Sequence, residues 1–193
     1  MVTEPLHPTE HRGYRELYVA LTQLARHWQR LGGRLAGSRV GTQLLSGAGE
    51  ANQLLDALTV LTERRGLHGR PLAAGFGASI AGARNVLGDR FLERNQAVRL
   101  ALLDVHHGRE LLDYLGRAAE RRGDAEAAAF CRSGRERLGK VKDDVRAAHV
   151  AMAAEPDRAI RAAEDSITGW LASRAAAAVG TLGELVDRRA SRR

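Results

Sequence analysis

Apolar residues recur along most of this chain with the spacing of an α-helix. From about residue 10 to residue 33, steps of about 100° per residue place the large apolar residues on one stripe: Leu17, Leu21, Leu24, Trp28 and Leu31. Prolines, which interrupt helices, occur only at positions 5, 8, 71 and 156. No run of alternating β-branched residues indicates a strand. The pattern therefore predicts an all-α protein.

The second helix is expected to follow a connector that is rich in glycine. This connector begins at Gly32-Gly33, where the first helix should end, and extends to Gly49. Ser46 is a suitable N-cap, because its hydroxyl can accept a hydrogen bond from the first helical turn. The second helix is therefore predicted over about 46–65.

The third and fourth helices are separated by the clearest boundary in the sequence. The third helical region covers about 72–122, and its part from Asp89 onward has the more regular pattern. Gly123 and Asp124 then place a helix stop directly before an N-cap, which predicts a fourth helix over about 125–153. Helices joined by short loops favour an antiparallel four-helix bundle.

The chain divides into three predicted parts. Residues 1–9 form a flexible N-terminus, residues 10–153 form the bundle, and residues 154–193 form a C-terminal amphipathic helical arm with a basic tail. Pro156 restarts the chain at a first-turn position that proline tolerates, with a weaker helix over 157–190. The arm could cover the bundle, lie on an anionic membrane surface, or dock on a larger assembly or nucleic acid. Its candidate partner-binding residues are Trp170, Arg188, Arg189, Arg192 and Arg193.

Composition changes this picture in two respects. The net charge is +7, and 28 of the 30 basic residues are arginine, since only Lys140 and Lys142 are lysine. This usage is typical of a GC-rich genome, but guanidinium groups also pair well with phosphates and acidic partners. Basic and acidic residues are interleaved through both halves, so neither half is a basic domain.

One cysteine excludes an internal disulfide, and no leader or spanning segment is found, which predicts a cytoplasmic location.

The most unusual chemistry lies in the third helix, around Asp104 and His107. Asp104 falls inside the apolar arc and His107 at its edge, and a buried carboxylate needs a partner or a metal. The spacing of three residues lets both side chains face one ligand, as in the di-iron sites of helical bundles. The alternative is that Asp104 pairs with an arginine of a neighbouring helix and that His107 donates to a carbonyl group. Further candidate metal ligands are His106, Glu50, Glu110 and Glu136.

Residues 97–152 resemble the second hairpin of the short bacterial ferritin-like bundles. The resemblance rests on a central histidine (His106), the segments Leu111-Leu-Asp-Tyr-Leu115 and Ala119 to Phe130, and a carboxylate at Glu136 on the last helix. If His106 is the family's histidine, Leu103 stands where a glutamate is expected; if His107 is used, the earlier residue is Asp104. The first-helix glutamate is missing in both registers. The resemblance implies a ferritin-like bundle with an altered or absent metal site.

Other residues with chemical potential have simpler interpretations. Cys131 lies near the apolar stripe of the fourth helix and is expected to be a small buried residue. His27 and His68 are expected to face solvent. Gly108 is expected to open room beside Asp104 for a neighbouring side chain, with a bound ion as the alternative. The glycines between 75 and 82 lack a preceding strand and a Lys-Ser/Thr pair, which excludes a nucleotide-binding loop.

Three hypotheses about function follow. The first is a non-enzymatic ferritin-like bundle that acts through self-association, as a homo-oligomer, or through docking on a partner. The second is a protein that binds a divalent metal, iron, manganese or zinc, through Asp104 and His107. The third is an electrostatic binder of nucleic acid or an anionic membrane, whose affinity would fall steeply with salt.

Overall fold

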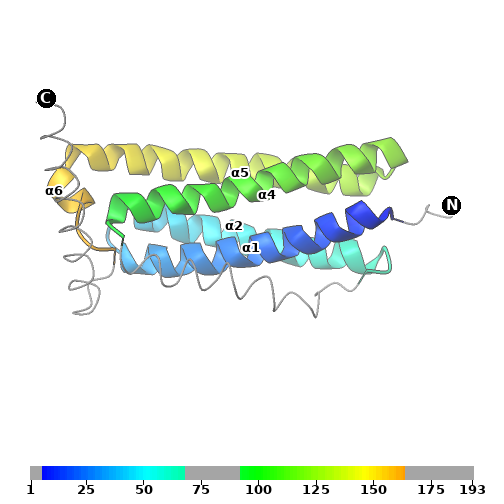
Figure 1. Ribbon diagram of the computed structural model, residues 1–193, viewed down its shortest axis with the longest axis horizontal. Helices are drawn as coiled ribbons and strands as arrows, with labels where there is room; N and C mark the ends of the chain where they lie inside the picture. The colour runs from blue at the N-terminus through cyan, green and yellow to red at the C-terminus, as the bar shows by residue number, and fades with distance from the viewer. Residues whose placement is uncertain (1–5, 68–91, 164–193) are drawn as a thin grey trace, which may run out of the picture.

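The computed structural model describes residues 6–67 and 92–163 of the chain. Within these two stretches the protein is helical, apart from an isolated bridge between Glu93 and Ala162. Four long helices make up most of it: α1 (Pro8–Arg34), α2 (Arg39–Glu63), α4 (Arg94–Arg122) and α5 (Ala125–Ala151). The predicted all-α class is confirmed for the described residues (Figure 1).

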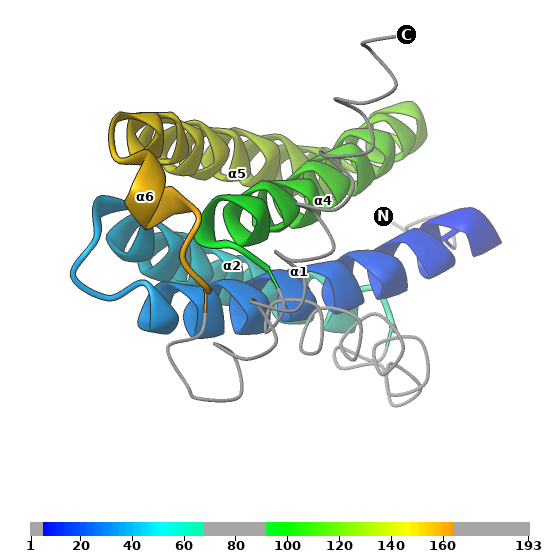
Figure 2. The same ribbon diagram turned by 60° about the vertical axis from the view of Figure 1, so that its left-hand side comes forward.

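The four long helices lie side by side along the length of the molecule (Figures 1 and 2). α1 packs on α2 and α4, and α5 packs on α4 and α2. Short connections join α1 to α2, at residues 35–38, and α4 to α5, at residues 123–124. Each long helix therefore has two long neighbours and must bury more than a single narrow stripe.

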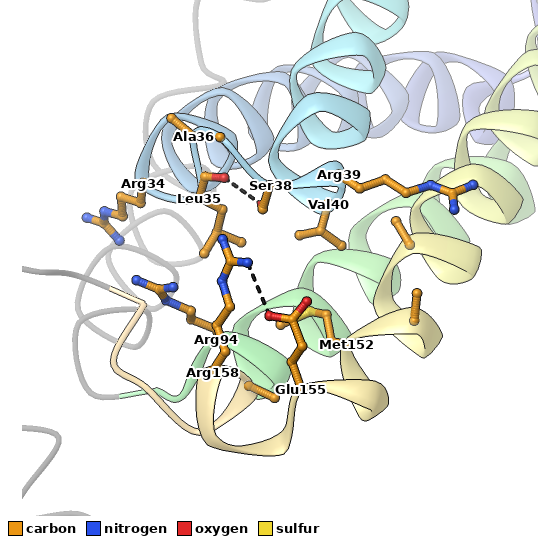
Figure 3. A pocket seen from close by; sticks show the side chains of 14 residues that line it. Arg34, Leu35, Ala36, Ser38, Arg39, Val40, Arg94, Met152, Glu155 and Arg158 are labelled. Carbon is orange, nitrogen blue, oxygen red and sulfur yellow. Dashed lines mark hydrogen bonds and ion pairs between the residues drawn. The ribbon is translucent and has the colours of Figure 1, made fainter.

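α2 begins at Arg39, so the predicted start at Ser46 is wrong. The N-cap is Ser38, whose hydroxyl accepts from the Gly41 amide at 3.1 Å and donates to the Leu35 carbonyl at 2.6 Å (Figure 3). The glycines that were predicted to form a connector lie inside α2, where they allow neighbouring groups to approach the helix closely. A Cβ atom on Gly41 would clash with the Leu35 carbonyl, and one on Gly47 would clash with the Trp28 ring.

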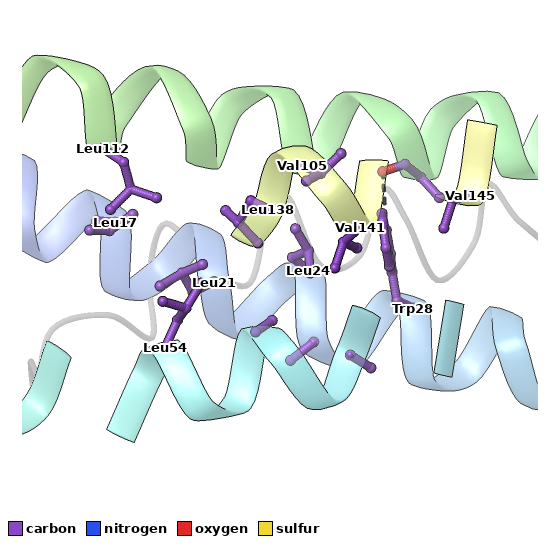
Figure 4. Close-up of a cluster of buried hydrophobic side chains, with 14 of the residues drawn as sticks. Leu17, Leu21, Leu24, Trp28, Leu54, Val105, Leu112, Leu138, Val141 and Val145 are labelled. Atoms are coloured by element: carbon purple, nitrogen blue, oxygen red, sulfur yellow. Dashed lines mark hydrogen bonds between the residues drawn. The ribbon is translucent and has the colours of Figure 1, made fainter. Parts of the chain in front are cut away.

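The core consists of the inward stripes of the four long helices (Figure 4). The stripe predicted for α1 is confirmed, since its five large side chains are fully buried: Leu17, Leu21, Leu24, Trp28 and Leu31. The indole of Trp28 reaches α4, where its Nε1 donates to the Ala101 carbonyl at 3.0 Å. This bond satisfies the one polar atom of the largest buried side chain and links α1 to α4.

The predicted boundary between α4 and α5 is confirmed. Gly123 adopts the left-handed conformation, with φ of 75°, and ends α4. Asp124 is the N-cap of α5, and its Oδ1 accepts from the Ala127 amide at 3.0 Å. At its other end, α4 begins at Arg94; residues 72–91 of the predicted third helical region lie outside the described residues.

After α5 the chain forms a 3₁₀ turn (Met152–Ala154) and a short helix, α6 (Pro156–Ala159). Pro156 occupies the first turn of α6, as predicted, but the helix ends at Ala159, so the prediction of a helix continuing from 157 is wrong at 160–163. There the chain pairs with the segment before α4, and Ala163 is buried. Trp170 and the four terminal arginines lie outside the described residues. Among the described helices, none has the length and apolarity needed to cross a membrane.

Candidate functional site

Among the described residues, Asp104 pairs with His27 of α1 and with no arginine. The Nδ1 atom of His27 lies 2.5 Å from Oδ2 of Asp104. The prediction that His27 faces solvent is wrong, because its side chain is only 2 % exposed. Since α1 has two neighbours, it buries a second stripe at seven-residue spacing, formed by Gly13, Ala20 and His27. A sequence analysis that seeks one apolar stripe per helix does not find it.

His107 contacts a different residue of α1 from Asp104, so the two side chains do not share one partner. Its Nε2 lies 3.3 Å from Oε1 of Glu16 on α1, and the imidazole is 54 % exposed. His106 is also exposed, with its Nδ1 3.8 Å from Oε1 of Glu110. Asp104 and His107, three residues apart on α4, therefore contact different parts of α1. Asp104 meets the buried His27, and His107 lies at the exposed edge of the contact between α1 and α4.

The two remaining ligand candidates lie on the other pair of helices. Glu50 of α2 accepts from Nε of Arg137 at 2.8 Å, which links α2 to α5. Glu136, on α5, is exposed. Within residues 6–67 and 92–163, no group of three or more histidine, cysteine or carboxylate side chains is placed to hold a metal ion. The structure thus brings only His106 and Glu110 of the six candidate ligands close to each other, and it joins three others to side chains of neighbouring helices.

Sequence analysis missed a buried cluster of charges at the end of the molecule where α1 begins and α4 ends. Arg65, at the end of α2, forms a two-pronged bond with Asp124: Nε lies 2.8 Å from Oδ2, and Nη2 lies 2.6 Å from Oδ1. Nη2 of Arg122 lies 3.0 Å from Oδ2 of Asp124 and 3.3 Å from Oε1 of Glu10. All four side chains are at most 12 % exposed. We call these four residues the charge cluster; it ties the ends of all four long helices together.

Within the charge cluster, Arg65 and Asp124 shift each other's pKa. The hydrogen bonds from the Arg65 guanidinium lower the pKa of Asp124 and raise the pKa of Arg65. Sequence analysis identified Asp124 only as an N-cap, because its arginine partner is 59 residues away along the chain. The doublet Arg64-Arg65 directly after α2 was the available signal.

Tyr14 and Cys131 are buried close to the charge cluster, and both are protonated. Burial raises the pKa of the Cys131 thiol to about 12, and burial likewise raises the pKa of Tyr14. A thiol of this kind is a poor nucleophile at neutral pH. The prediction that Cys131 is a buried core residue is confirmed, since its side chain is 1 % exposed.

The glycines of α4 serve close packing where the structure describes them. A Cβ atom on Gly108 would lie 3.4 Å from Leu138 of α5, and one on Gly116 would lie 3.2 Å from Cys131. The room beside Gly108 is therefore taken by a neighbouring side chain, as predicted. His68 and the glycines between 75 and 82 lie outside the described residues.

Several described polar residues of the four long helices thus pair with one another across helix contacts. The resemblance of residues 97–152 to ferritin-like bundles stays a prediction. Comparison of this chain with protein-family models, with curated proteins and with solved structures finds no match in any of the three.

Proposed function

We propose that this chain is a non-enzymatic, cytoplasmic helical bundle of ferritin-like type that acts by associating with a second copy of itself. Three features support it: the pairing of the candidate ligands, the order of the helix ends, and the exposed apolar side chains of α4.

The observation that carries the proposal is the pairing of the candidate ligands. Asp104 pairs with His27, Glu50 with Arg137, and His107 with Glu16. Each pair joins two helices, so the side chains that a metal or a substrate would need instead hold the helices together. This use favours a protein that works as a scaffold over one that performs chemistry in its interior.

The order of the helix ends supports an antiparallel, ferritin-like arrangement. Arg65, at the end of α2, meets Asp124, which directly follows the end of α4. Arg39, at the start of α2, lines the same cavity as Arg94, at the start of α4. α2 therefore ends at the opposite end of the molecule from the start of α4. Ferritin-like bundles have this order, with one long crossover between the second and third long helices.

The outer surface of α4 supports self-association. Leu100 and Leu103 are 42 % and 61 % exposed, and Tyr114 is 51 % exposed. Steps of three and four residues connect them through His107 and Glu110, which places all five side chains on one face of the helix. Two copies of this face would bury the leucines. Because each leucine is already partly covered, it would contribute less than the ~1.5–3 kcal/mol of a fully exposed leucine that becomes buried.

Sedimentation of the purified full chain over a range of concentrations tests this proposal. We expect a dimer whose dissociation constant rises at least about tenfold in Leu103→Glu. The matched control is Val60→Glu, which adds the same charge at an apolar residue 47 % exposed on α2. Dimerisation should be unchanged in the control. A wild-type chain that stays monomeric at every concentration, or equal losses in both variants, would contradict the proposal.

A further inference from the structure

The contact between α4 and α5 carries two rows of mainly basic side chains on its outer side. The two helices lie side by side along their length (Figures 1 and 2). On α4, steps of three and four residues put four side chains in one row: Arg99, Leu102, His106 and Arg109. On α5, the same steps give a second row: Gly139, Lys142, Arg146 and His149. Neither row contains an acidic residue. We call these eight residues the basic strip.

Contacts at both ends of the basic strip bring its two rows together. A Cβ atom on Gly139 would lie 3.7 Å from Cζ of Arg109, so the guanidinium group of Arg109 lies over the backbone of α5. At the other end, burial and then the charge of Arg99 lower the pKa of His149, so Arg99 lies near this imidazole. Lys142 and the residues up to His149 lie between these two contacts on α5. The cations of both rows therefore belong to one surface.

The fold leaves the four cations of the basic strip unpaired. They are Arg99, Arg109, Lys142 and Arg146. In the part of the chain that the structure describes, none of them forms an ion pair or a side-chain hydrogen bond. Nε of Arg109 is buried and has no hydrogen-bond partner there. Arg99 and Arg146 are exposed, and the other two are partly buried. These positive charges are therefore available to a partner.

The acids around the basic strip do not cancel its charge. Asp113 continues the row on α4, but it already pairs with Arg117 at 3.4 Å and with Arg135 at 2.6 Å. Glu110 and Asp143 lie beside the rows, each directly after a member of one row. Even when both of these acids are counted, four cations and two carboxylates leave a charge of +2 among the described residues.

We propose that the basic strip binds the phosphate backbone of double-stranded nucleic acid, independently of base sequence. Arg109 follows Arg99 by ten residues, so at about 1.5 Å per residue the strip is about 15 Å long. A duplex carries one negative charge per about 1.7 Å, so phosphates meet the cations in any register along this length. Guanidinium groups pair with phosphate oxygens through two parallel N–H bonds, and such contacts carry no sequence information.

The side chains of the basic strip favour a duplex over a single strand or a membrane. The rows contain no Phe, Tyr or Trp side chain on which an unpaired base could stack. Peripheral helices bind membranes through apolar side chains that enter the lipid, in addition to cations. The one large apolar side chain of the rows, Leu102, is partly buried. A flat lipid surface would also bring its negative charges against Glu110 and Asp143.

This inference goes beyond the proposed function, because the basic strip lies on the side of α4 that faces α5. The exposed leucines proposed for self-association lie on a different face of α4. Arg146 belongs to α5, which contributes no residue to that face, so Arg146→Ala should leave the dimer unchanged in sedimentation. Loss of self-association and loss of nucleic acid binding are therefore separate results.

Fluorescence anisotropy of the full chain with a labelled DNA duplex of about 20 base pairs, over a range of salt concentrations, tests the inference. For four phosphate contacts, the logarithm of the affinity should fall against the logarithm of the salt concentration with a slope of about −3.6. This slope is a loss of roughly a hundredfold between about 50 and 200 mM salt. Arg146→Ala should make the slope shallower by about one, and Arg99→Ala combined with Arg146→Ala by about two.

The matched control is Arg26→Ala, which removes the same charge from an exposed residue at the contact between α1 and α2, on the opposite side of the bundle (Figure 2). It should leave the slope unchanged. Absence of duplex binding at low salt, a slope near zero, or equal changes in Arg26→Ala and Arg146→Ala would overturn the inference. All three substituted arginines are exposed, so the variants should fold, and thermal unfolding curves check this.

Three further probes test the choice of partner: a DNA single strand of the same length, vesicles that contain phosphatidylserine, and polyglutamate. We expect each of them to bind more weakly than the duplex at equal salt. Tighter binding of any one of them would overturn the assignment to double-stranded nucleic acid. Two duplexes of unrelated base sequence should bind with equal affinity, and a clear preference for one would contradict binding through phosphates alone.

Discussion

The two ends of the molecule use arginine in opposite ways. At one end, Arg65 and Arg122 are buried against Asp124 and Glu10, so two positive charges meet two negative charges. At the other end, four arginines and Glu155 are among the described residues that line a cavity of about 240 Å³. There Arg158 is 49 % exposed and lies 3.2 Å from Glu155. The same residue type is therefore enclosed in ion pairs at one end and partly open to solvent at the other, and this difference in burial decides how much each ion pair contributes to stability.

The largest effect is expected from breaking the charge cluster. Asp124→Ala removes the N-cap of α5 and leaves Arg65, only 11 % exposed, with the 3.2 Å contact to the more exposed Glu126 as its remaining carboxylate contact among the described residues. Removing one member of a buried ion pair costs about 3 kcal/mol or more, and we expect a loss of that size in the free energy of unfolding measured with urea. The control is Asp113→Ala, because Asp113 is 35 % exposed and its pairs with Arg117 and Arg135 are closer to solvent. Its loss should stay below about 1 kcal/mol; equal losses would remove the distinction between the two kinds of pair.

A smaller effect is expected at the opposite end, where the α1–α2 connection forms part of the cavity. Gly41→Ala places a methyl group against the Leu35 carbonyl, and we expect a loss of about 1–3 kcal/mol on unfolding by urea. Gly49→Ala, in the same helix, meets no atom within 4 Å and should instead stabilise the protein by about 0.5–1 kcal/mol. If both substitutions changed the free energy of unfolding in the same direction, the close approach of Gly41 to the Leu35 carbonyl would not explain how α2 can begin at Arg39.

The two ends should also differ in their response to pH. Because Arg65 lowers the pKa of Asp124, this carboxylate stabilises the fold above the pKa of the unfolded chain, about 4, and the stabilisation is lost as the pH falls further. Near the cavity end, burial and then Arg99 lower the pKa of His149. As the pH falls, the stabilisation that neutral His149 provides is lost below about pH 6.5, at a higher pH than the stabilisation from Asp124. The reason is that His149 in the unfolded chain takes up a proton at a higher pH than His149 in the folded protein.

Urea midpoints measured between about pH 3 and pH 8 separate these two contributions. Asp124→Asn should flatten the dependence below about pH 4, and His149→Gln should flatten it over the range that begins at about pH 6.5 and extends downward. The pH-dependent part of the free energy of unfolding that each substitution removes should be smaller than the loss expected for Asp124→Ala. A His149→Gln variant with the full wild-type slope over that range would contradict the assignment.

The parts of the fold that depend on local sequence were predictable, and the parts that depend on distant contacts were not. The α1 stripe and the Gly123-Asp124 boundary follow from helical periodicity and capping, which act within a few residues. The start of α2 at Arg39 could not be predicted from local periodicity and capping. A glycine that marks a loop and a glycine that admits a neighbouring helix look alike in one sequence.

The candidate site shows the same division. The sequence pattern predicts that Asp104 needs a partner, but it does not indicate His27, which lies 77 residues away. Likewise, the pattern identifies Asp124 as a cap without its bond to Arg65. In both cases the missing information is which faces of α1 and α2 are covered, and this depends on the packing of four helices at once.

Above all, we propose that Asp104, His107 and Glu50 hold helices together and do not bind a metal. Elemental analysis of the full chain, produced with iron, manganese and zinc supplied, tests it most directly, with Asp104→Ala and His107→Ala measured in parallel. We predict less than about 0.1 metal ion per chain in all three proteins. A stoichiometric amount of one of these metals in the wild type, lost in both variants, would contradict the claim.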